Sequence, residues 1–498
     1  MNNAIFHPGQ LTSNSYRCEF LVIGSGAGGS VAAMELAETG RDVIVIEEGL
    51  HAKTSGFTNN ISNMTQQNWR NGGVTPFWGK PPIGFAEGKC VGGGTVINGG
   101  LLWRTPQRML DIWENQYGLK GYTFDDLIPH FEKIEQILNV GFHKKDNQNV
   151  DSDVLIKGCD NLGWNYVPVP RAGGEDCSNS NLCPTGCPTG AKQSTAITYI
   201  PRAINSGAKI FTGSRAIQIN KHGNLADSVQ VKVKSQGQSR VIDIKSDYIF
   251  LSGGAIQTPF LLQKSKINAN AGKKLEFHFN LKFVAEFEKK IRAQDGTIFT
   301  VQVQEFMDDG LLIMASNYRR HYLAMTLAHF GNTVINEVME KYDYCGLFVA
   351  QVQAKSKGKV TPAFRTDPFV QYDFDPDDMH AIIDAIEKTV KLLFQSGARK
   401  VYLPIIGSLP IIDPDQSLKK EIQKLRPENL EIVSVHAMAS CRMGPDESAV
   451  TDLSGKINGY ENIYITDASI LPSNIGESPQ GTIMALSHKI LNKHIYGG

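Results

Sequence analysis

The sequence has 498 residues, and its 50 lysines and arginines balance 50 aspartates and glutamates, so the formal net charge at neutral pH is zero. A neutral chain has no net field to gather nucleic acid or an anionic membrane, and we expect neither as a partner. One hydrophobic core rarely serves a chain this long, so two or three cooperating lobes are expected. Charges interrupt every apolar run before the roughly 18 residues that span a bilayer, and residues 1–17 lack the apolar centre of a secretory signal. The sequence therefore predicts a cytoplasmic protein with no transmembrane segment.

The clearest pattern of elements opens near residue 20. Residues 20–24 (FLVIG) predict a buried strand, residues 28–39 a helix and residues 42–48 (DVIVIEE) a second strand. A strand, a helix and a strand in this order form a βαβ unit, from which parallel α/β sheets are built.

A glycine-rich turn joins the first strand of this unit to its helix. Residues 24–29 (GSGAGG) satisfy GxGxxG in the strand and helix context that gives the motif meaning. Gly24 would permit the tight turn, Gly26 would let the backbone approach a pyrophosphate, and Gly29 would let helix and strand pack closely. Glu47 ends the second strand where a carboxylate could accept hydrogen bonds from an adenosine ribose. The pattern predicts dinucleotide binding, although the motif alone does not choose between NAD and FAD.

The rest of the chain is predicted to be mixed α/β. The stretch from Gly72 to Gly100 is rich in glycine and proline, and we expect it to be irregular and functional rather than packed helix or strand. Strands are predicted at residues 209–213, 228–235 and 247–254, and helices at residues 124–140 and 376–396. At the C-terminus, residues 462–469 and 482–495 repeat the strand, loop and helix order of the beginning.

Three further segments resemble signatures of the glucose–methanol–choline (GMC) family of oxidoreductases. Residues 88–100 (GKCVGGGTVINGG) resemble the glycine-rich signature that approaches the flavin ring, and residues 249–262 (IFLSGGAIQTPFLL) resemble the second signature. Residues 436–444 (HAMASCRMG) and 465–486 resemble the closing active-site block. Together with GxGxxG, the four motifs follow the family's order, whereas residues 276–430 match only as a substrate lobe of suitable size.

The resemblance implies a fold, a cofactor and an activity. The fold would be α/β, with a discontinuous Rossmann-like FAD-binding domain and a mixed α/β substrate-binding domain built on an antiparallel sheet. The FAD-binding domain would comprise residues 1–110, 195–275 and 431–498, and the substrate domain residues 111–194 and 276–430. The activity would be oxidation of an alcohol to a carbonyl, with FAD as the hydride acceptor.

Residues that hold FAD are carried over from the same motifs. The ADP half would be held by Gly24, Gly26, Gly29 and Glu47. Gly93 and Asn98 would lie near the isoalloxazine, and Asp467 near the ribityl-pyrophosphate part. Gly93 could equally be a simple turn glycine, and Asp467 a turn residue that follows its strand.

His436 stands out among the twelve histidines. It lies in HAMASCRMG, which resembles the family's HPxGTCRMG with Ala437 where proline is usual. The resemblance makes His436 the base that takes the hydroxyl proton as hydride leaves the carbinol carbon, and an ordinary histidine pKa of about 6.5 suits that task. His278 lies in GKKLEFH, which resembles a structural turn of the family, and His488 falls on the closing helix, so neither is expected to act in catalysis.

The second catalytic position departs from the family pattern. Where Asn or His is usual, this chain has Ser478. A serine hydroxyl can donate or accept one hydrogen bond to the substrate oxygen but cannot serve as a base. Glu477 or Asn474 could reach inward in its place.

Three of the eight cysteines, Cys177, Cys183 and Cys187, crowd into one Gly/Pro/Asn-rich loop. Three thiolates without a fourth ligand nearby suit a three-iron iron–sulfur cluster better than a four-iron cluster or zinc. The spacing resembles the cluster loop in large subunits of bacterial membrane-linked sugar dehydrogenases of this family. A cluster would send electrons to a protein or quinone acceptor and favours a dehydrogenase over an oxidase. The alternative is a structural Cys/Gly-rich loop.

Two other functions stay open beside alcohol oxidation. Some members of the family keep FAD but act as non-redox lyases or decarboxylases, and an electron-relay subunit would bind FAD without chemistry of its own. His436 in the family position argues against the relay. The alcohol itself, whether sugar, sterol, long-chain or choline-like, is not predicted, because residues 276–430 carry the least recognisable pattern.

Overall fold

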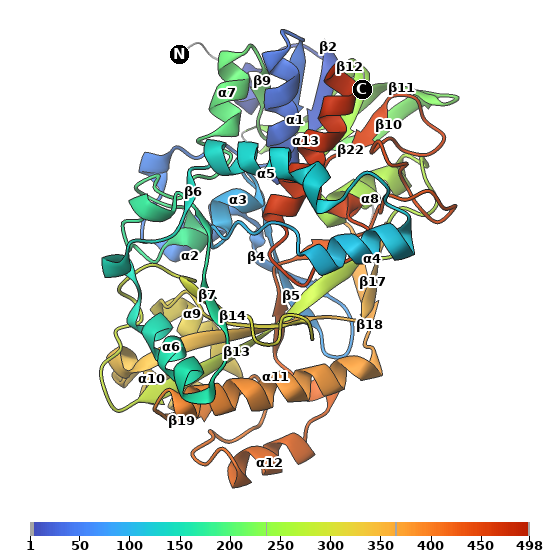
Figure 1. Ribbon diagram of the computed structural model, residues 1–498. Coiled ribbons are helices and arrows are strands. Elements are labelled where there is room, and N and C mark those ends of the chain that lie inside the picture. The colour runs from blue at the N-terminus through green and yellow to red at the C-terminus, as the bar shows by residue number, and fades with distance from the viewer. Residues whose placement is uncertain (1–3, 236, 364–365, 497–498) are drawn as a thin grey trace.

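The computed structural model describes residues 4–235, 237–363 and 366–496. Two large sheets organise this part of the chain, one above the other in Figure 1. Helices α1, α7 and α13 lie beside the upper sheet, and α11 runs beneath the lower one (Figure 1). None of the helices described is long and apolar enough to cross a membrane.

The first sheet follows the order β1-β9-β3-β2-β12-β11-β10, with β22 paired to β12. Neighbouring strands from β1 to β12 are parallel, and so is the pair of β12 and β22, whereas β11 pairs antiparallel with both β12 and β10. Its strands are β1 (Ile5–Phe6), β2 (Ser15–Ile23), β3 (Val43–Ile46), β9 (Lys209–Phe211), β10 (Ser214–His222), β11 (Leu225–Ser235), β12 (Gln238–Leu251) and β22 (Ile463–Ile465). Two helices, α1 (Ala27–Glu38) and α8 (Gly254–Lys264), contact its strands. Helices α7 (Tyr199–Asn205) and α13 (Gln480–Tyr496) pack on α1, and α5 (Phe124–Ile137) packs on α13.

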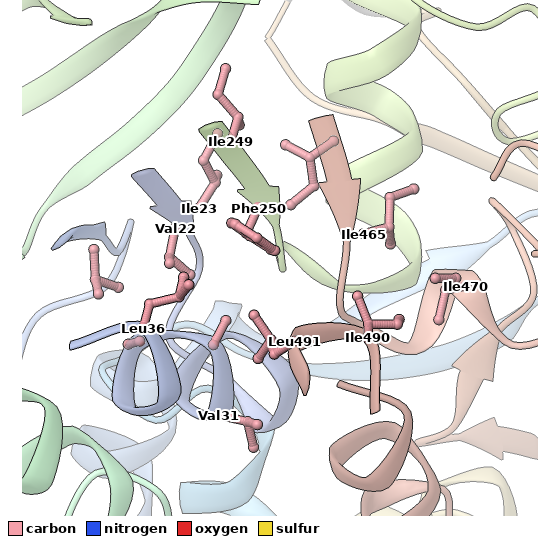
Figure 2. Close-up of a cluster of buried hydrophobic side chains, with 14 of the residues drawn as sticks. Val22, Ile23, Val31, Leu36, Ile249, Phe250, Ile465, Ile470, Ile490 and Leu491 are labelled. Carbon is pink, nitrogen blue, oxygen red and sulfur yellow. The ribbon is translucent and has the colours of Figure 1, made fainter. Parts of the chain in front are cut away.

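The parallel part of this sheet is buried on both faces, and its sequence reflects that. Every residue of β3 (VIVI) is buried, as expected for a parallel strand covered by helices on both sides. Helix α1 is buried along most of its length, so its sequence shows no polar stripe. Figure 2 shows Val22 and Phe250 of the sheet on the side where Leu36 of α1 and Leu491 of α13 lie. Full burial of a side chain such as Phe250 stabilises the fold by at most about 3 kcal/mol.

The second sheet follows the order β4-β5-β20-β13-β16-β15-β14-β7 and is mostly antiparallel. Three short strands, β21, β20 and β19, pair one after another along β13. The strands are β4 (Trp69–Phe77), β5 (Ile83–Gly88), β7 (Tyr166–Pro168), β13 (Glu276–Phe287), β14 (Val301–Val303), β15 (Leu311–Ala315), β16 (Cys345–Gln353), β19 (Ala398–Tyr402), β20 (Ile432–Ser434) and β21 (Ala437–Met438). The neighbouring helices are α6 (Val150–Leu162), α9 (Arg320–Thr326), α10 (Asn332–Glu340), α11 (Pro376–Gln395) and α12 (Gln416–Gln423).

The sequence of helix α11 explains where the helix begins and which of its faces packs against the second sheet. It begins after Asp375, whose side chain accepts a hydrogen bond from the amide of Asp377, and Pro376 occupies the first turn, where its missing N–H does no harm. Ile382, Ile386 and other apolar residues at helical spacing face the sheet and are buried. The remaining α-helices are α2 (Ile61–Asn68), α3 (Gly94–Ile97) and α4 (Gln107–Tyr117), and two further two-stranded antiparallel sheets pair β6 (Val140–Gly141) with β8 (Arg171–Ala172) and β17 (Lys357–Thr361) with β18 (Phe369–Asp373).

The predicted fold class is confirmed, and so are the βαβ unit and the C-terminal strand and helix. The expectation of an irregular stretch from Gly72 to Gly100 is wrong, since β4, β5 and α3 lie there. Strands form in this stretch because of a distant segment, since β5 pairs with β20, some 350 residues further along the chain. β4, β5, β20 and β21 thus join the second sheet although their segments were predicted to lie in the FAD-binding domain; the domain boundaries otherwise stay a prediction.

Candidate active site

A cavity of about 520 Å³ is lined by residues of both sheets. Its lining includes residues 24–28 and Glu47, which follow strands β2 and β3. The lining also includes His436, Ser478 and residues of the second sheet. The cavity thus connects the predicted dinucleotide site with the predicted catalytic residues, in a volume typical of ligand sites.

Gly26 opens the N-terminus of α1 toward this cavity. It lines the cavity, and a Cβ added to it would meet no protein atom within 4 Å. A Cβ added to Gly93 would lie 3.0 Å from the Cα of Gly26, so the two glycines bring the two glycine-rich segments into backbone contact. Free backbone at a helix N-terminus is what a pyrophosphate requires.

The other glycines of the motif serve close packing of the protein on itself. A Cβ added to Gly24 would lie 2.3 Å from the carbonyl oxygen of Ser252. The same addition at Gly29 would lie 2.0 Å from the carbonyl oxygen of Gly24. Gly28, which the motif does not specify, is the tightest, because its Cβ would lie 1.5 Å from the carbonyl oxygen of Thr466.

Glu47 is buried and lines the cavity. Its carboxylate accepts hydrogen bonds from the amide and hydroxyl of Ser25, at 3.1 and 2.7 Å, and from the amide of Gly49, at 2.8 Å. Burial raises the pKa of Glu47, and these bonds oppose that rise. The Ser25 hydroxyl also accepts from the amide of Gly92, at 3.1 Å. Glu47 therefore orders the glycine turn, and part of its acceptor capacity remains for a ligand.

Asp467 ties the end of β22 to the start of α8. Its carboxylate accepts from the amide of Gly254 at 2.8 Å, the hydroxyl of Thr258 at 2.5 Å and the amide of Ser469 at 2.8 Å. It lines the cavity, and burial raises its pKa. Its turn role is evident from these bonds, and contact with FAD stays a prediction.

Lys192 clamps two loops together at the predicted flavin end of the cavity. Its buried ammonium donates to the carbonyl oxygens of Val96, Asn98 and Cys183, at 2.6, 2.8 and 2.8 Å. The Asn98 side chain, which lines the cavity, accepts from the amide of Gly100 and donates to Gln480. Burial lowers the pKa of Lys192 to about 8. Sequence reasoning missed this residue, whose only signal was a lone lysine after the cysteine loop.

The predicted iron–sulfur site is not supported. In the part of the chain that the structure describes, no group of three Cys, His, Asp or Glu is arranged to hold a metal. Cys183 accepts a hydrogen bond from Arg171 at 3.8 Å, and Cys187 accepts one from the amide of Lys192 at 3.5 Å. The hollow that Cys177, Cys183 and Cys187 line measures about 10 Å³, which is room for about one water molecule. The three cysteines thus surround one small hollow without being arranged as metal ligands.

His436 lies between β20 and β21 and pairs with a second histidine. Its Nδ1 is 3.0 Å from Nδ1 of His278 on β13, and Nε2 of His278 accepts the amide hydrogen of Gly476 at 3.2 Å. Burial lowers the pKa of His436 to about 4 and that of His278 well below its usual range. His278 was expected to be structural, and the pairing of β13 with β21 makes it the partner of His436.

Ser478 lines the cavity together with His436. Its amide donates to Glu477 at 2.7 Å, and the Glu477 carboxylate also accepts from Gln302 at 2.8 Å. Burial raises the pKa of Glu477 to about 7. Asn474 accepts from Gln353 at 2.6 Å and donates to the carbonyl oxygen of Ala354 at 2.8 Å. Glu477 and Asn474 are thus engaged within the protein, and Ser478 is the one of the three that faces the cavity.

A dinucleotide cradle that opens into the same cavity as a buried histidine pair is the arrangement of a nucleotide-dependent oxidoreductase. Family models described as GMC oxidoreductase match residues 18–280 and residues 354–487. The chain therefore belongs to the GMC oxidoreductase family. FAD is the cofactor that this family implies, and the open backbone at Gly26 fits it.

Similar proteins extend over nearly the whole chain. An uncharacterized GMC-type oxidoreductase, y4nJ of Sinorhizobium fredii, is 31% identical over 94% of this chain and 93% of its own length. The long-chain-alcohol oxidase FAO3 of Arabidopsis thaliana is 26% identical over 95% of this chain and 67% of its own. Among solved structures, pyridoxine 4-oxidase of Mesorbium loti superposes with a TM-score of 0.74 at 15% identity, covering 96% of this chain and 99% of that one. The last likeness bears on the fold alone.

Proposed function

We propose that the protein oxidises an alcohol to a carbonyl compound by hydride transfer to FAD, with His436 as the base. The observation that carries the proposal is the single cavity that holds both the GxGxxG cradle and the pair of His436 and Ser478. The long-chain-alcohol oxidase among the relatives supports an alcohol as the class of substrate.

The same cavity supports a division of labour among the predicted cofactor residues. Gly26 and Glu47 would contact the ADP half of FAD, and Gly24 and Gly29 would hold the tight turn that shapes this part of the site. Gly93 and Asn98 would lie near the isoalloxazine, and Asp467 near the ribityl-pyrophosphate part. When bound, FAD supplies the acceptor for the hydride of the carbinol carbon. The protein's own task is then to orient the alcohol and to take the hydroxyl proton as the C–H and O–H bonds break and the C=O bond forms.

His278 sets the resting tautomer of His436. Because Nε2 of His278 accepts from the Gly476 amide, we assign the proton of neutral His278 to Nδ1, from which it donates to Nδ1 of His436. Neutral His436 then carries its proton on Nε2 and presents a donor to the substrate oxygen.

Proton abstraction needs the opposite tautomer. In that form Nδ1 of His436 donates to His278, and Nε2 of His436 is free to accept the hydroxyl proton. The Gly476 amide then loses its acceptor, which costs about 1–3 kcal/mol for a buried group. In our proposal His436 works as a base from this minor form, reached by exchange with solvent before the alcohol binds, and Ser478 holds the substrate oxygen by one hydrogen bond.

The experiment is a spectroscopic screen of the FAD-loaded protein without oxygen. Sugar, sterol, long-chain and choline-like alcohols are mixed with the protein, and bleaching of the flavin band is followed. Bleaching by at least one alcohol is the expected result. A flavin that stays oxidised with all four classes would contradict alcohol oxidation and favour a non-redox lyase or decarboxylase.

Reoxidation of the bleached flavin separates a dehydrogenase from an oxidase. The prediction of a dehydrogenase with a protein or quinone acceptor rested on the iron–sulfur cluster, which the arrangement of the described cysteines does not support. Slow reoxidation by air beside rapid reoxidation by a soluble quinone would indicate a dehydrogenase, and rapid oxygen consumption with peroxide formation would indicate an oxidase.

A further inference from the structure

One face of β13 forms part of the substrate end of the cavity. Residues two apart on a strand share a face, so His278, Asn280 and Lys282 project to the same side. Asn280 and Lys282 line the cavity, and His278 holds His436 at its edge. Opposite them on β16, Gln351 pairs with Asn280 and Val349 with Lys282, and both also line the cavity.

Lys282 places a cation in this part of the cavity without a protein counter-ion in contact. No carboxylate of the described residues lies within 4.0 Å of its ammonium, and no hydrogen bond to the ammonium is formed within that part of the chain. Burial lowers the pKa of Lys282, and the more distant Glu431 opposes that shift. Lys282 is half-buried, so its ammonium is open to the cavity and not to a protein partner. A ligand of opposite charge in the cavity would supply the counter-ion that the protein does not.

Further donors without partners belong to residues that line the same cavity. The side-chain amide nitrogen of Asn280, Nε2 of His321 and the hydroxyl of Tyr322 are buried and have no hydrogen-bond partner among the described residues. All three residues line the cavity. His321 lies close enough to Lys282 for the ammonium to lower its pKa further, after burial and Arg319. An amide N–H₂ can only donate, and the other two groups can donate as well, so the cluster suits an acceptor.

We propose that Lys282, Asn280, His321 and Tyr322 form a binding site for a carboxylate on the alcohol substrate. One ammonium with neutral donors matches a single negative charge, whereas a phosphate dianion ordinarily draws several cations or a helix N-terminus. The proposal names the substrate class for the alcohol oxidation proposed above and rests on it for the role of His436.

The strand also indicates how far the carboxylate lies from the reacting carbon. Lys282 is four residues from His278, which corresponds to about 13 Å along an extended strand. Met314 and Val349 line the cavity with buried apolar side chains. The spacing and the apolar lining fit a hydroxy acid whose hydroxyl and carboxylate are separated by several methylenes, such as 6-hydroxyhexanoate, rather than an α-hydroxy acid.

Calorimetric titration of the FAD-loaded protein tests the anion site without turnover. Hexanoate and its neutral analogue hexanamide are compared on the wild type, on Lys282→Met and on Lys282→Arg. Hexanoate should bind the wild type about 10- to 100-fold more tightly than hexanamide, the range expected for a charged hydrogen bond. Lys282→Met should remove most of that difference, chiefly by weakening hexanoate binding, and Lys282→Arg should retain most of it.

Equal binding of hexanoate and hexanamide by the wild type, or hexanoate binding that survives Lys282→Met, would overturn the site. The wild-type comparison needs no variant, so a folding failure of Lys282→Met does not remove the test. Flavin bleaching by 6-hydroxyhexanoate and 1-hexanol separates the two proposals. Tight hexanoate binding with no bleaching by these two alcohols or by any class of the four-class screen would defeat the proposed oxidation alone. Equal bleaching by the two alcohols without hexanoate binding would defeat the anion site alone.

Discussion

Gly28 and Gly26 lie two residues apart, yet their replacement by alanine should affect different properties: the stability of the fold at position 28 and the affinity for FAD at position 26. A Cβ at position 28 would lie 1.5 Å from the carbonyl oxygen of Thr466, where real Cβ atoms stay beyond 3.0 Å. Both sides of this contact are backbone, so α1 and β22 must separate by about 1.5 Å, and the amide of Thr466 bonds Leu251 of β12 at 3.0 Å. Overpacking that side chains can absorb costs about 1–3 kcal/mol. For Gly28→Ala we expect a loss of about 3 kcal/mol or more.

Gly26→Ala is the matched control, because the added methyl meets no protein atom within 4 Å and the backbone of Gly26, at φ −69° and ψ −159°, suits any residue. The methyl would occupy the space that we assign to the FAD pyrophosphate. The unfolding free energy of Gly26→Ala protein without FAD should therefore stay within about 0.5 kcal/mol of the wild type or rise slightly. The affinity of this variant for FAD should fall.

Urea denaturation of FAD-free protein and titration of flavin fluorescence measure the two quantities separately. Gly28→Ala should have a lower unfolding free energy than the wild type. Gly26→Ala should keep the wild-type unfolding free energy and lose affinity for FAD. Equal destabilisation of the two variants without FAD would refute the packing argument, and unchanged FAD affinity in Gly26→Ala would refute the pyrophosphate site.

Three further predictions concern single residues. In Ser478→Ala, flavin reduction by an active alcohol should slow by about 10-fold or less, since one neutral hydrogen bond is lost; a larger loss would give Ser478 more than a positioning role. The pKa of His436 is lowered to about 4, so the unfolded chain binds this proton first as pH falls below about 6.5. Stability should decline from there to about pH 4, and the reduction rate should stay level until near pH 4; a fall in rate centred near pH 6.5 would contradict this. Lys192→Met leaves three buried carbonyls without their donor and should lower the unfolding free energy by about 3 kcal/mol or more. The control Lys355→Met removes an exposed ion pair and should change it by less than about 1 kcal/mol, and similar losses in both variants would argue against the clamp.

Local patterns predicted the first sheet well. The apolar run of β3 and the glycines of residues 24–29 carry their meaning in short stretches of sequence, because burial on both faces and close backbone approach constrain residue type directly. The packing role of Gly28 was not predicted, because its neighbour Thr466 is remote in sequence. The strands β4 and β5 were not predicted for the same reason, since their place in the second sheet depends on pairing with β20.

Site residues that act through remote partners were the ones missed. His278 and His436 are 158 positions apart and meet only because β13 pairs with β21. Lys192 contacts carbonyls almost a hundred positions away. The iron–sulfur prediction from the cysteine loop was not supported for a different reason. Short spacing brings thiols near one another, but a cluster also requires that they point at one centre, and spacing does not determine their direction.

The most direct test of the account is single-turnover flavin reduction in His436→Ala protein that retains FAD. An alcohol that bleaches the wild-type flavin without oxygen is mixed with both proteins in a stopped-flow spectrometer, and the two reduction rates are compared at saturating alcohol. We predict a rate at least about 100-fold lower in the variant, the scale typical of losing a general base. An unchanged rate in FAD-replete His436→Ala would contradict the assignment of His436 as the base.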